Sequence, residues 1–360
     1  MIVTEEQQQV CFGQGGLRAP LTRFMQPDGR WGYVVSGAHP GTGHSHTLVN
    51  FIGFPDFFDM REKTEDLSDM RFLMETHHRA NYAALRLSGH QGYRDWKELW
   101  GAHDGEILVI ASCGPSLTHS LPTLYKHRDK FKLMTLNRSH RAFQDSDAKP
   151  DYHYFVERRA LLDWAHEVEN GTGRAVGDLT MDGVTMIGTP QCDPRMVNLF
   201  KPENRYWGWS SLGALGKFGE CADLTSFDVK GGTTIGNAPY IAHKLGFSKI
   251  VLVGCDFSLD CRVVVDDKRA VAEPRRMYFD RMYYHTHHGA NKQAFLSRHL
   301  PVLGIDGKAC SVDARMLGWK DYFMAVLDIV QYEGGTECVN ATPRGILNWN
   351  TQSLEEALGL

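Results

Sequence analysis

Short apolar runs, separated by polar and glycine-containing segments, make up the central part of the chain. ILVIA (107–111), KLMTL (132–136) and YHYFV (152–156) are each followed by polar or turn-forming residues. Their length and their lack of alternation are typical of strands buried on both faces, as in a parallel sheet. A helical segment at 121–131 separates the first two runs. Strand, helix and strand in this order predict right-handed βαβ units.

A later segment repeats this pattern in its clearest form. Asn237 is predicted to cap a helix with Pro239 in its first turn, and Gly246 is predicted to end it. IVLVG (250–254) then reads as a buried strand, and Asp256 lies just past its end. The unit therefore adds another strand to the same sheet.

Weaker signals complete the predicted fold. VTMIG (184–188) reads as a strand, and 315–331 reads as an amphipathic helix. The expected buried face of that helix comprises Met316, Trp319, Phe323, Met324, Leu327 and Val330. These elements predict an α/β fold with a doubly wound, mostly parallel, Rossmann-like sheet, an N-terminal extension and C-terminal helices.

Composition and charge narrow the class of protein. The chain has 360 residues with 42% hydrophobic positions, a net charge of −4 and no long basic run, so nucleic acid is not the expected partner. No apolar stretch approaches the roughly 18 residues of a membrane span, and the N-terminus lacks the features of a secretory signal. The eight cysteines form no CxxC pair. We therefore expect reduced thiols and a cytoplasmic location.

Polar residues or glycines follow each predicted central strand. The Gly114-Pro115-Ser116 turn, Asn137, Glu157 and Asp256 all come at such strand ends. Ligands bind outside the carboxyl ends of parallel strands, although polar loops also follow most strands for no functional reason. A glycine turn with a helix behind it suits a nucleotide phosphate. Neither a GxxxxGK[ST] loop nor a GxGxxG motif after a strand is present.

Histidines offer a second candidate for chemistry. His285, His287 and His288 fall within RMYYHTHHGAN, and a neutral histidine is the usual general base near pH 7. A surface loop or an adventitious metal site would explain the same cluster. For His44 and His46 in GTGHSH we favour a loop, because no third metal ligand is evident.

Several of these segments resemble a known group of families. ILVIASCGPSL resembles the opening strand and turn of the bacterial CMP-sialic acid sialyltransferases, the motility-associated-factor glycosyltransferases and the MptE-like 6-hydroxymethylpterin diphosphokinases. LMTLNRSHRAF, KPDYHYFVE and GGTTIGNAPYIAHKLGFSKIVLVGCDFSL resemble the strands that follow, and YYHTHHGANKQAFL falls where the sialyltransferases carry their catalytic histidine. LGIDGKACSVDARML and CVNATPRGI are similar to the end of the motility-factor domain. The resemblance covers 105–345 and implies a sialyltransferase-like fold, flanked by an N-terminal extension of unclear fold (1–104) and a C-terminal tail (346–360).

The resemblance also implies roles for individual residues. Gly114, Pro115 and Ser116 would form the nucleotide phosphate turn, and Asn137 would contact the nucleotide. Thr233 and Thr234 would hold cytidine or phosphate at a helix start, and Asp256 would line the site. His287, or His285 or His288 beside it, would be the general base.

Three further residues complete the predicted nucleotide site: Cys113, Glu157 and Ser258. Cys113 stands where the family has asparagine, and Ser258 stands where the sialyltransferases have a phosphate-binding tyrosine. The candidate replacements for that tyrosine are Tyr278, Tyr283 and Tyr284. These departures bear on how the donor phosphate is held.

The activity implied by the resemblance is transfer of a nonulosonic-acid-type sugar from a CMP-activated donor to a hydroxyl acceptor. His287 would take the acceptor proton, and no metal would be obligatory. The alternative is an MptE-like diphosphokinase that moves pyrophosphate from ATP to a pterin alcohol. That reaction needs Mg²⁺, which Asp256 with Asp260, or Asp266 with Asp267, would hold. A non-catalytic nucleotide-binding protein of the same fold is the third possibility.

Overall fold

The computed structural model of the chain describes most of its residues. They are 7–12, 17–25, 31–38, 45–48, 65–137, 139–143, 148–156, 181–209, 223–226, 234–266, 269–274, 300–312 and 314–360. The chain divides into two compact units, and each is discontinuous in sequence. The first comprises Met1–Leu67, Phe257–Tyr322 and Arg344–Ile346, and the second comprises Ser68–Asp256, Phe323–Pro343 and Leu347–Leu360.

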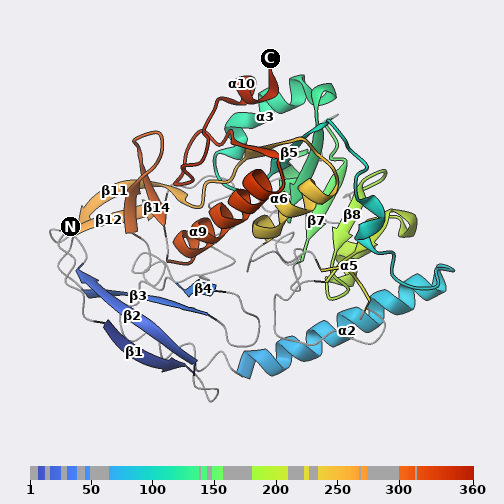
Figure 1. The fold of residues 1–360 in the computed structure, drawn as a ribbon, viewed down its shortest axis with the longest axis horizontal. Coiled ribbons are helices and arrows are strands. Elements are labelled where there is room, and N and C mark those ends of the chain that lie inside the picture. Colours follow the sequence, from blue (N-terminus) through green and yellow to red (C-terminus); the bar gives the residue numbers. More distant parts are fainter. Residues whose placement is uncertain are drawn as a thin grey trace. The chain divides into compact units, whose positions relative to one another are not determined.

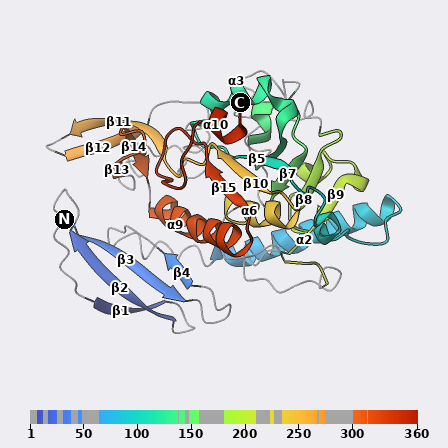
Figure 2. The ribbon, with the colours of Figure 1, turned by 45° about the horizontal axis from the view of Figure 1, so that its top comes forward.

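The second unit is built on a seven-stranded sheet (Figures 1 and 2). Its strands are β5 (Ile107–Ala111), β6 (Lys132–Leu136), β7 (Tyr152–Phe155), β8 (Thr185–Gly188), β9 (Arg205–Trp207), β10 (Lys249–Val253) and β15 (Glu337–Asn340). The spatial order is β15-β10-β5-β6-β7-β8-β9, and every pairing is parallel. The predicted α/β class with a doubly wound parallel sheet is therefore confirmed.

The order of the strands creates a topological switch point between β5 and β10. From β5 the chain adds β6, β7, β8 and β9 on one side, and then returns to place β10 on the other side. Leu108 pairs with Ile250 and Val109 with Val251, and all four side chains are fully buried. Burial on both faces explains why these strands read as continuous apolar runs.

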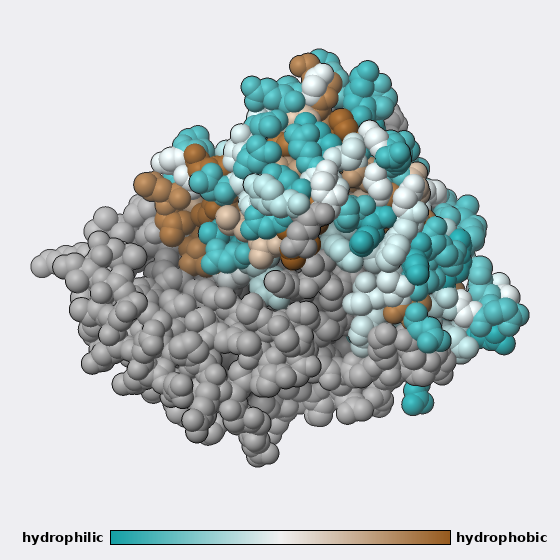
Figure 3. Space-filling view, viewed as in Figure 1, coloured by the Kyte–Doolittle hydropathy of each residue, from teal (hydrophilic) through white to brown (hydrophobic). Residues whose placement is uncertain are grey.

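Helices cover the two faces of this sheet. α3 (Leu117–Lys126) follows β5, and α10 (Leu354–Leu358) lies beside it, with the Thr123 hydroxyl donating to a Glu355 carboxylate oxygen at 2.9 Å. Figure 2 shows α6 (Thr234–Lys244) on the opposite face. On the side seen in Figure 3, hydrophilic residues cover most of the described surface around α3 and α10.

The start of α6 differs from the prediction. The helix begins at Thr234, so Asn237 lies inside it, fully buried, and does not cap it. Pro239 consequently falls in the second turn instead of the first. The predicted start was wrong because Asn237, a residue type that often caps helices, is instead buried inside the helix, which already begins at Thr234. Gly246 ends the helix with φ +96°, as predicted.

The short elements of the second unit lie in its loops. They are η1 (Trp96–Leu99), η2 (Arg128–Lys130), η3 (Ser139–Phe143), α5 (Pro194–Val197) and η5 (Pro202–Asn204). The helix α2 (Glu65–Leu87) leads into this unit. Leu85 and Trp96 are buried in it, and Leu85 packs in one core cluster with Phe155 and Trp207 of the sheet. The contacts place Ser68 and the residues after it in the same unit as the sheet.

The first unit contains two four-stranded sheets. One has the antiparallel order β1 (Gln7–Phe12), β2 (Leu17–Met25), β3 (Trp31–Ala38), β4 (Ser45–Leu48). The other has the order β12 (Arg269–Pro274), β11 (Leu259–Asp266), β14 (Ala309–Val312), β13 (Leu300–Leu303). Residues 257–322, which the sequence placed within the catalytic domain, therefore belong to a different unit from the parallel sheet.

The predicted final helix is observed as α9 (Ala314–Asp328), followed by a π-helical turn, η7 (Ile329–Glu333). Four of the six residues predicted for its apolar face are buried, and Trp319 and Met324 are half-buried. None of the helices among the described residues combines the length and the apolar character that crossing a bilayer requires.

Candidate functional site

The candidate site lies where the parallel strands of the second unit end, which we call the carboxyl edge of the sheet. At the switch point, the Ser112 amide donates to the Val253 carbonyl and the Gly114 amide donates to the Gly254 carbonyl, each at 2.9 Å. The β5–β10 ladder thus continues past both strands. Ligands of open α/β folds bind at such a switch point.

Position 114 requires glycine because Asp256 and the Gly254 carbonyl pack closely against its backbone. A Cβ at this position would lie 2.1 Å from Asp256 Oδ2 and 2.5 Å from the Gly254 carbonyl oxygen. Any larger residue would push the turn away from the end of β10. The turn and Asp256 consequently form one fitted unit.

Asp256 ties the end of β10 to the start of α3. The residue is 2% exposed, and its carboxylate accepts the Ser116 hydroxyl at 2.7 Å and the Ser116 amide at 3.3 Å. A negative charge at a helix N-terminus is stabilised by the helix dipole. The amides of Gly114 and Ser116 are therefore engaged within the chain.

The residues around Asp256 are also buried and bonded. The Cys255 amide donates to the Thr342 hydroxyl at 3.0 Å, and the Thr342 amide donates to Asn340 Oδ1 at 3.0 Å. Burial, followed by the nearby Asp256 carboxylate, raises the pKa of the Cys255 thiol well above its ordinary value. Cys255 therefore stays protonated and supports the turn.

Asn137 brings the end of β6 to the same edge. Its backbone adopts a left-handed conformation, φ 45°, which asparagine tolerates better than most residues. Asn137 Nδ2 donates to the Thr234 hydroxyl at 3.0 Å, and Oδ1 is buried without a hydrogen-bond partner. The amide carbonyl is thus available to a ligand that donates a hydrogen bond.

Ser139 and His140 hold Asn137 in place. The Ser139 hydroxyl donates to the Ala111 carbonyl at 2.6 Å and accepts the Leu136 amide at 2.8 Å, which links the ends of β5 and β6. His140 Nδ1 donates to the Asn137 carbonyl at 2.6 Å. Both side chains are almost fully buried.

A second histidine packs against this support. The ring of His153, on β7, is fully buried and meets the ring of His140 edge-on, with centroids 5.0 Å apart. Its Nδ1 contacts the Thr135 hydroxyl at 2.9 Å. Burial, followed by repulsion from His140, lowers the pKa of His153 well below its ordinary value. His153 is therefore a neutral residue of the core.

The carboxyl edge continues past β8 with another set of buried polar groups. The segment 189–193 follows that strand, and Gln191 and Asp193 within it are 2% and 3% exposed. Asp193 caps α5 through the Arg195 amide at 2.9 Å. Burial raises the pKa of Asp193, but its hydrogen bonds and ion pair with Arg195 outweigh this effect, so the pKa lies below its ordinary value.

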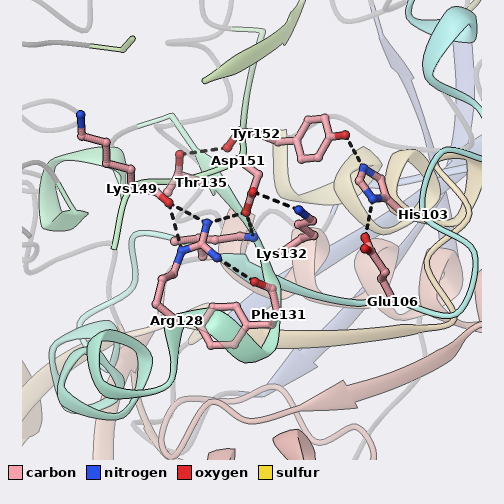
Figure 4. A network of polar contacts seen from close by, with 10 residues as sticks. His103, Glu106, Arg128, Phe131, Lys132, Thr135, Lys149, Asp151 and Tyr152 are labelled. Carbon is pink, nitrogen blue, oxygen red and sulfur yellow. Dashed lines mark hydrogen bonds and ion pairs between the residues drawn. The ribbon is translucent and has the colours of Figure 1, made fainter. Parts of the chain in front are cut away.

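The opposite, amino edge of the sheet carries an ion-pair network (Figure 4). Asp151 accepts Arg128 at 2.5 Å and the Leu133 amide at 2.8 Å, and Lys132 Nζ lies 3.6 Å away. His103 contacts Glu106 through Nδ1 and Tyr152 through Nε2. Every named acceptor has its donors within the chain, so this edge is structural.

The structure brings together most of the described residues predicted for the site. Those near the carboxyl edge of one unit are Cys113, Gly114, Pro115, Ser116, Asn137, Thr234 and Asp256. Ser258 is buried in the other unit. Outside the described residues lie Glu157, Thr233, His44, Asp267, Tyr278, Tyr283, Tyr284, His285, His287 and His288. Asp260, Asp266 and His46 are placed on strands of the first unit, where only their backbone is described.

Sequence reasoning missed Ser139, His140, Gln191, Asn340 and Thr342. Asn340 ends an apolar strand, so the rule that found Asn137 would have found it too. Ser139 and His140 carry no comparable signal, because their hydrogen bonds join strands that are distant in sequence. Among the side chains the structure describes, no three histidine, cysteine, aspartate or glutamate residues gather in a metal-binding arrangement.

Comparison with known proteins adds family information. Residues 91–261 match the family described as 6-hydroxymethylpterin diphosphokinase MptE-like. A solved structure of the MAf glycosyltransferase from Magnetospirillum magneticum AMB-1 aligns with a TM-score of 0.54 and 19% identity. The alignment covers 81% of this chain and 39% of that one, and it shows a shared fold.

Two other comparisons add no information about the family or the fold. A muconate lactonizing enzyme from Mucobacterium Smegmatis aligns with a TM-score of 0.16 and 13% identity over 70% of this chain and 79% of that one, which carries no argument. No curated protein matches the chain. The predicted resemblance to the MptE-like and motility-factor families is confirmed by the family match and the shared fold.

Proposed function

We propose that the protein is a glycosyltransferase, which the fold it shares with the MAf glycosyltransferase and the MptE-like match over residues 91–261 support. It moves a nonulosonic-acid-type sugar from a CMP-activated donor to a hydroxyl acceptor. The observation that carries the proposal is the Asn137–Thr234 pair beside the β5–β10 switch point, with Asn137 Oδ1 buried and unpartnered. A buried acceptor without a donor costs about 1–3 kcal/mol, which a nucleoside amino or hydroxyl group would recover.

The phosphate of the donor has one favoured place. The N-terminus of α3 is neutralised by Asp256, whose carboxylate already takes the Ser116 amide. The other helix that begins at this edge is α6, which starts at Thr234. Helix N-termini bind anions, so the CMP phosphate would lie at the start of α6, near Thr233 and Thr234.

The chemistry follows from this placement. Cleavage at the anomeric carbon gives a cation-like transition state and a leaving CMP phosphate, which the α6 amides and threonine hydroxyls would stabilise. His287, which lies outside the described residues, would take the proton of the acceptor hydroxyl. No metal is required by this scheme.

The alternative is a 6-hydroxymethylpterin diphosphokinase, the activity that the description of the matching family names. Such an enzyme would take its pyrophosphate from ATP. It would need Mg²⁺ held by carboxylates. The Asp256 carboxylate is the one described at the switch point, and it is already bonded to Ser116. This arrangement favours glycosyl transfer.

Nucleotide titration tests the proposal. CMP at about a hundred times its dissociation constant should stabilise the protein by about 2.7 kcal/mol without added metal. Stabilisation by ATP with Mg²⁺, and none by cytidine nucleotides, would establish the alternative. A protein that binds neither would be neither enzyme.

Asn137→Gly tests the contact itself, because glycine keeps the left-handed backbone while removing the amide. We expect CMP affinity to fall about tenfold, the effect of losing roughly 1.4 kcal/mol. Asn350→Gly is the matched control, since Asn350 also has a positive φ (28°) and also donates one side-chain hydrogen bond, to the Cys338 carbonyl. If both variants lost the same CMP affinity, the proposed contact between Asn137 and the nucleotide would be contradicted.

The general base is tested with His285→Ala, His287→Ala and His288→Ala in a donor-hydrolysis or transfer assay. His287→Ala should lower turnover by about 10²–10⁴ while CMP affinity is kept, because the proposed role has the imidazole act on the acceptor and not on the nucleotide. Near-normal turnover in all three variants would remove the histidine cluster from the mechanism.

A further inference from the structure

The inference concerns the end of β8, where two amide side chains are buried with one hydrogen-bonding atom each left unpaired. Gln191 is 2% exposed and its Nε2 has no partner, and Asn81 of α2 is 1% exposed and its Oδ1 has no partner. Native interiors satisfy nearly all such atoms. Two exceptions within one cluster, at the edge where ligands bind, call for a physical explanation.

The two amides are held together by the backbone of the same loop. Asn81 Nδ2 donates to the Pro190 carbonyl at 3.0 Å and to the Cys192 carbonyl at 2.9 Å, so it grips the loop on both sides of Gln191. These two bonds use both amide hydrogens and fix which atom of Asn81 is the oxygen. His77 Nδ1 contacts the Gln191 carbonyl at 3.3 Å.

The free atoms are complementary in kind. Gln191 Nε2 is a donor and Asn81 Oδ1 is an acceptor. A sugar hydroxyl or an acylamino group can accept from the first and donate to the second. Because both side chains are almost fully buried, hydrogen bonds made there are strengthened by the low local dielectric.

The position along the edge fits the sugar part of the donor. β8 lies two strands from β6, which carries Asn137, and neighbouring strands are ~4.8 Å apart, so the two strand ends are separated by roughly 10 Å. A CMP moiety held near Asn137 would leave its attached sugar within reach of this second point.

From this geometry we infer that Gln191 and Asn81 form a subsite for one hydroxyl or acylamino group of the transferred sugar. The inference rests on the proposed function, and it adds a determinant of sugar specificity that is separate from the nucleotide contacts. CMP alone does not reach it.

Gln191→Met is the test, because methionine keeps the length of the side chain and removes its polar atoms. The probes are CMP and an inert 3-fluoro analogue of CMP-N-acetylneuraminic acid, titrated by calorimetry. We expect the variant to bind CMP as the wild type does and to bind the fluorinated CMP-sugar about tenfold more weakly, the effect of one lost hydrogen bond. Gln352→Met, at a half-buried position in the same unit, is the control and should change neither affinity.

A second readout needs no ligand. If Gln191 Nε2 is unpaired in the free protein, its removal should raise the melting temperature of the ligand-free protein by about 2–4 °C. A structural amide would give the opposite sign. Higher stability with weaker CMP-sugar binding supports the subsite.

The failures are distinguishable. A wild-type protein that binds neither CMP nor the CMP-sugar refutes the proposed function, and the subsite with it. Normal CMP-sugar binding by Gln191→Met, a parallel loss of CMP affinity, or a lowered melting temperature each overturns the subsite alone.

Discussion

Both edges of the parallel sheet carry clusters of polar residues, but the hydrogen-bonding groups are paired to different extents at the two edges. At the amino edge, Asp151 collects Arg128, Lys132 and a backbone amide. At the carboxyl edge, buried amide atoms of Asn137 and Gln191 remain without partners. A network satisfied within the chain supports the fold, whereas unsatisfied buried groups lower stability unless a ligand completes them. The difference leads us to expect that the amino edge supports the sheet and that the carboxyl edge is the one that binds a ligand.

The largest effect on the carboxyl edge is expected from a substitution at Gly114. Gly114→Ala places a Cβ 2.5 Å from the Gly254 carbonyl and against Asp256, so the Gly114–Gly254 hydrogen bond must open. Overpacking and the lost bond together should lower the free energy of unfolding by about 2–4 kcal/mol and abolish CMP binding. Chemical denaturation and calorimetry measure the two effects. Gly92→Ala, where nothing lies within 4 Å of the added Cβ, should be close to neutral.

Ser139→Ala tests how much the Ser139 hydroxyl, which links the ends of β5 and β6, contributes to stability and binding. The change leaves the Leu136 amide and the Ala111 carbonyl without the hydroxyl, so we expect a loss of about 2 kcal/mol in unfolding free energy and weaker CMP binding. Ser248→Ala removes an exposed hydroxyl that donates to the Glu106 carbonyl at the amino edge. It should cost less than about 0.5 kcal/mol and leave binding unchanged. If the two changes lowered stability and CMP binding equally, the two edges would not differ in the way proposed.

The buried His153 gives stability a pH dependence. Its pKa is lowered in the folded protein, so the unfolded chain takes up the proton first as the pH falls below about 6.5. The stability that depends on a neutral His153 is fully present above that pH and is lost on acidification. The free energy of unfolding then falls by at most about 1.4 kcal/mol per pH unit. Urea unfolding at pH 7.5, 6.5 and 5.5 should show a shallower loss in His153→Phe. An unchanged slope would mean that another group controls this range.

The smallest effect is expected at the amino edge. Asp151→Asn weakens partly exposed ion pairs with Arg128 and Lys132, which should cost about 1 kcal/mol or less, and less still in high salt. CMP affinity should be that of the wild type. A clear loss of nucleotide binding would show that the edges are coupled.

The strands of this sheet were predictable because burial on both faces leaves a continuous apolar run. ILVIA and KLMTL correspond to β5 and β6 without a shift, and the glycine and asparagine that follow them mark the carboxyl edge. The start of α6 was predicted three residues late, because Asn237 has the chemistry of a cap and is nevertheless buried inside the helix.

The supporting residues of the site were not predictable by the same means. Ser139 acts on Ala111, and Asn81 grips a loop that lies more than a hundred residues later in the chain. Such bonds depend on strand order, and a local pattern does not encode strand order. The early helix α2 gave no clear period in sequence, although its last turns share the core of the sheet.

The chain leaves the sheet unit after Asp256 and re-enters it at Phe323. Since Asp256 is fastened to Ser116 and the ladder of β10 is closed by its neighbours, the parallel sheet is complete whatever the length of the excursion. We therefore expect 257–322 to be an insertion point in evolution, where related chains can gain, lose or exchange material without altering the strands. Aligned relatives should show their length differences here and not within β5 or β10.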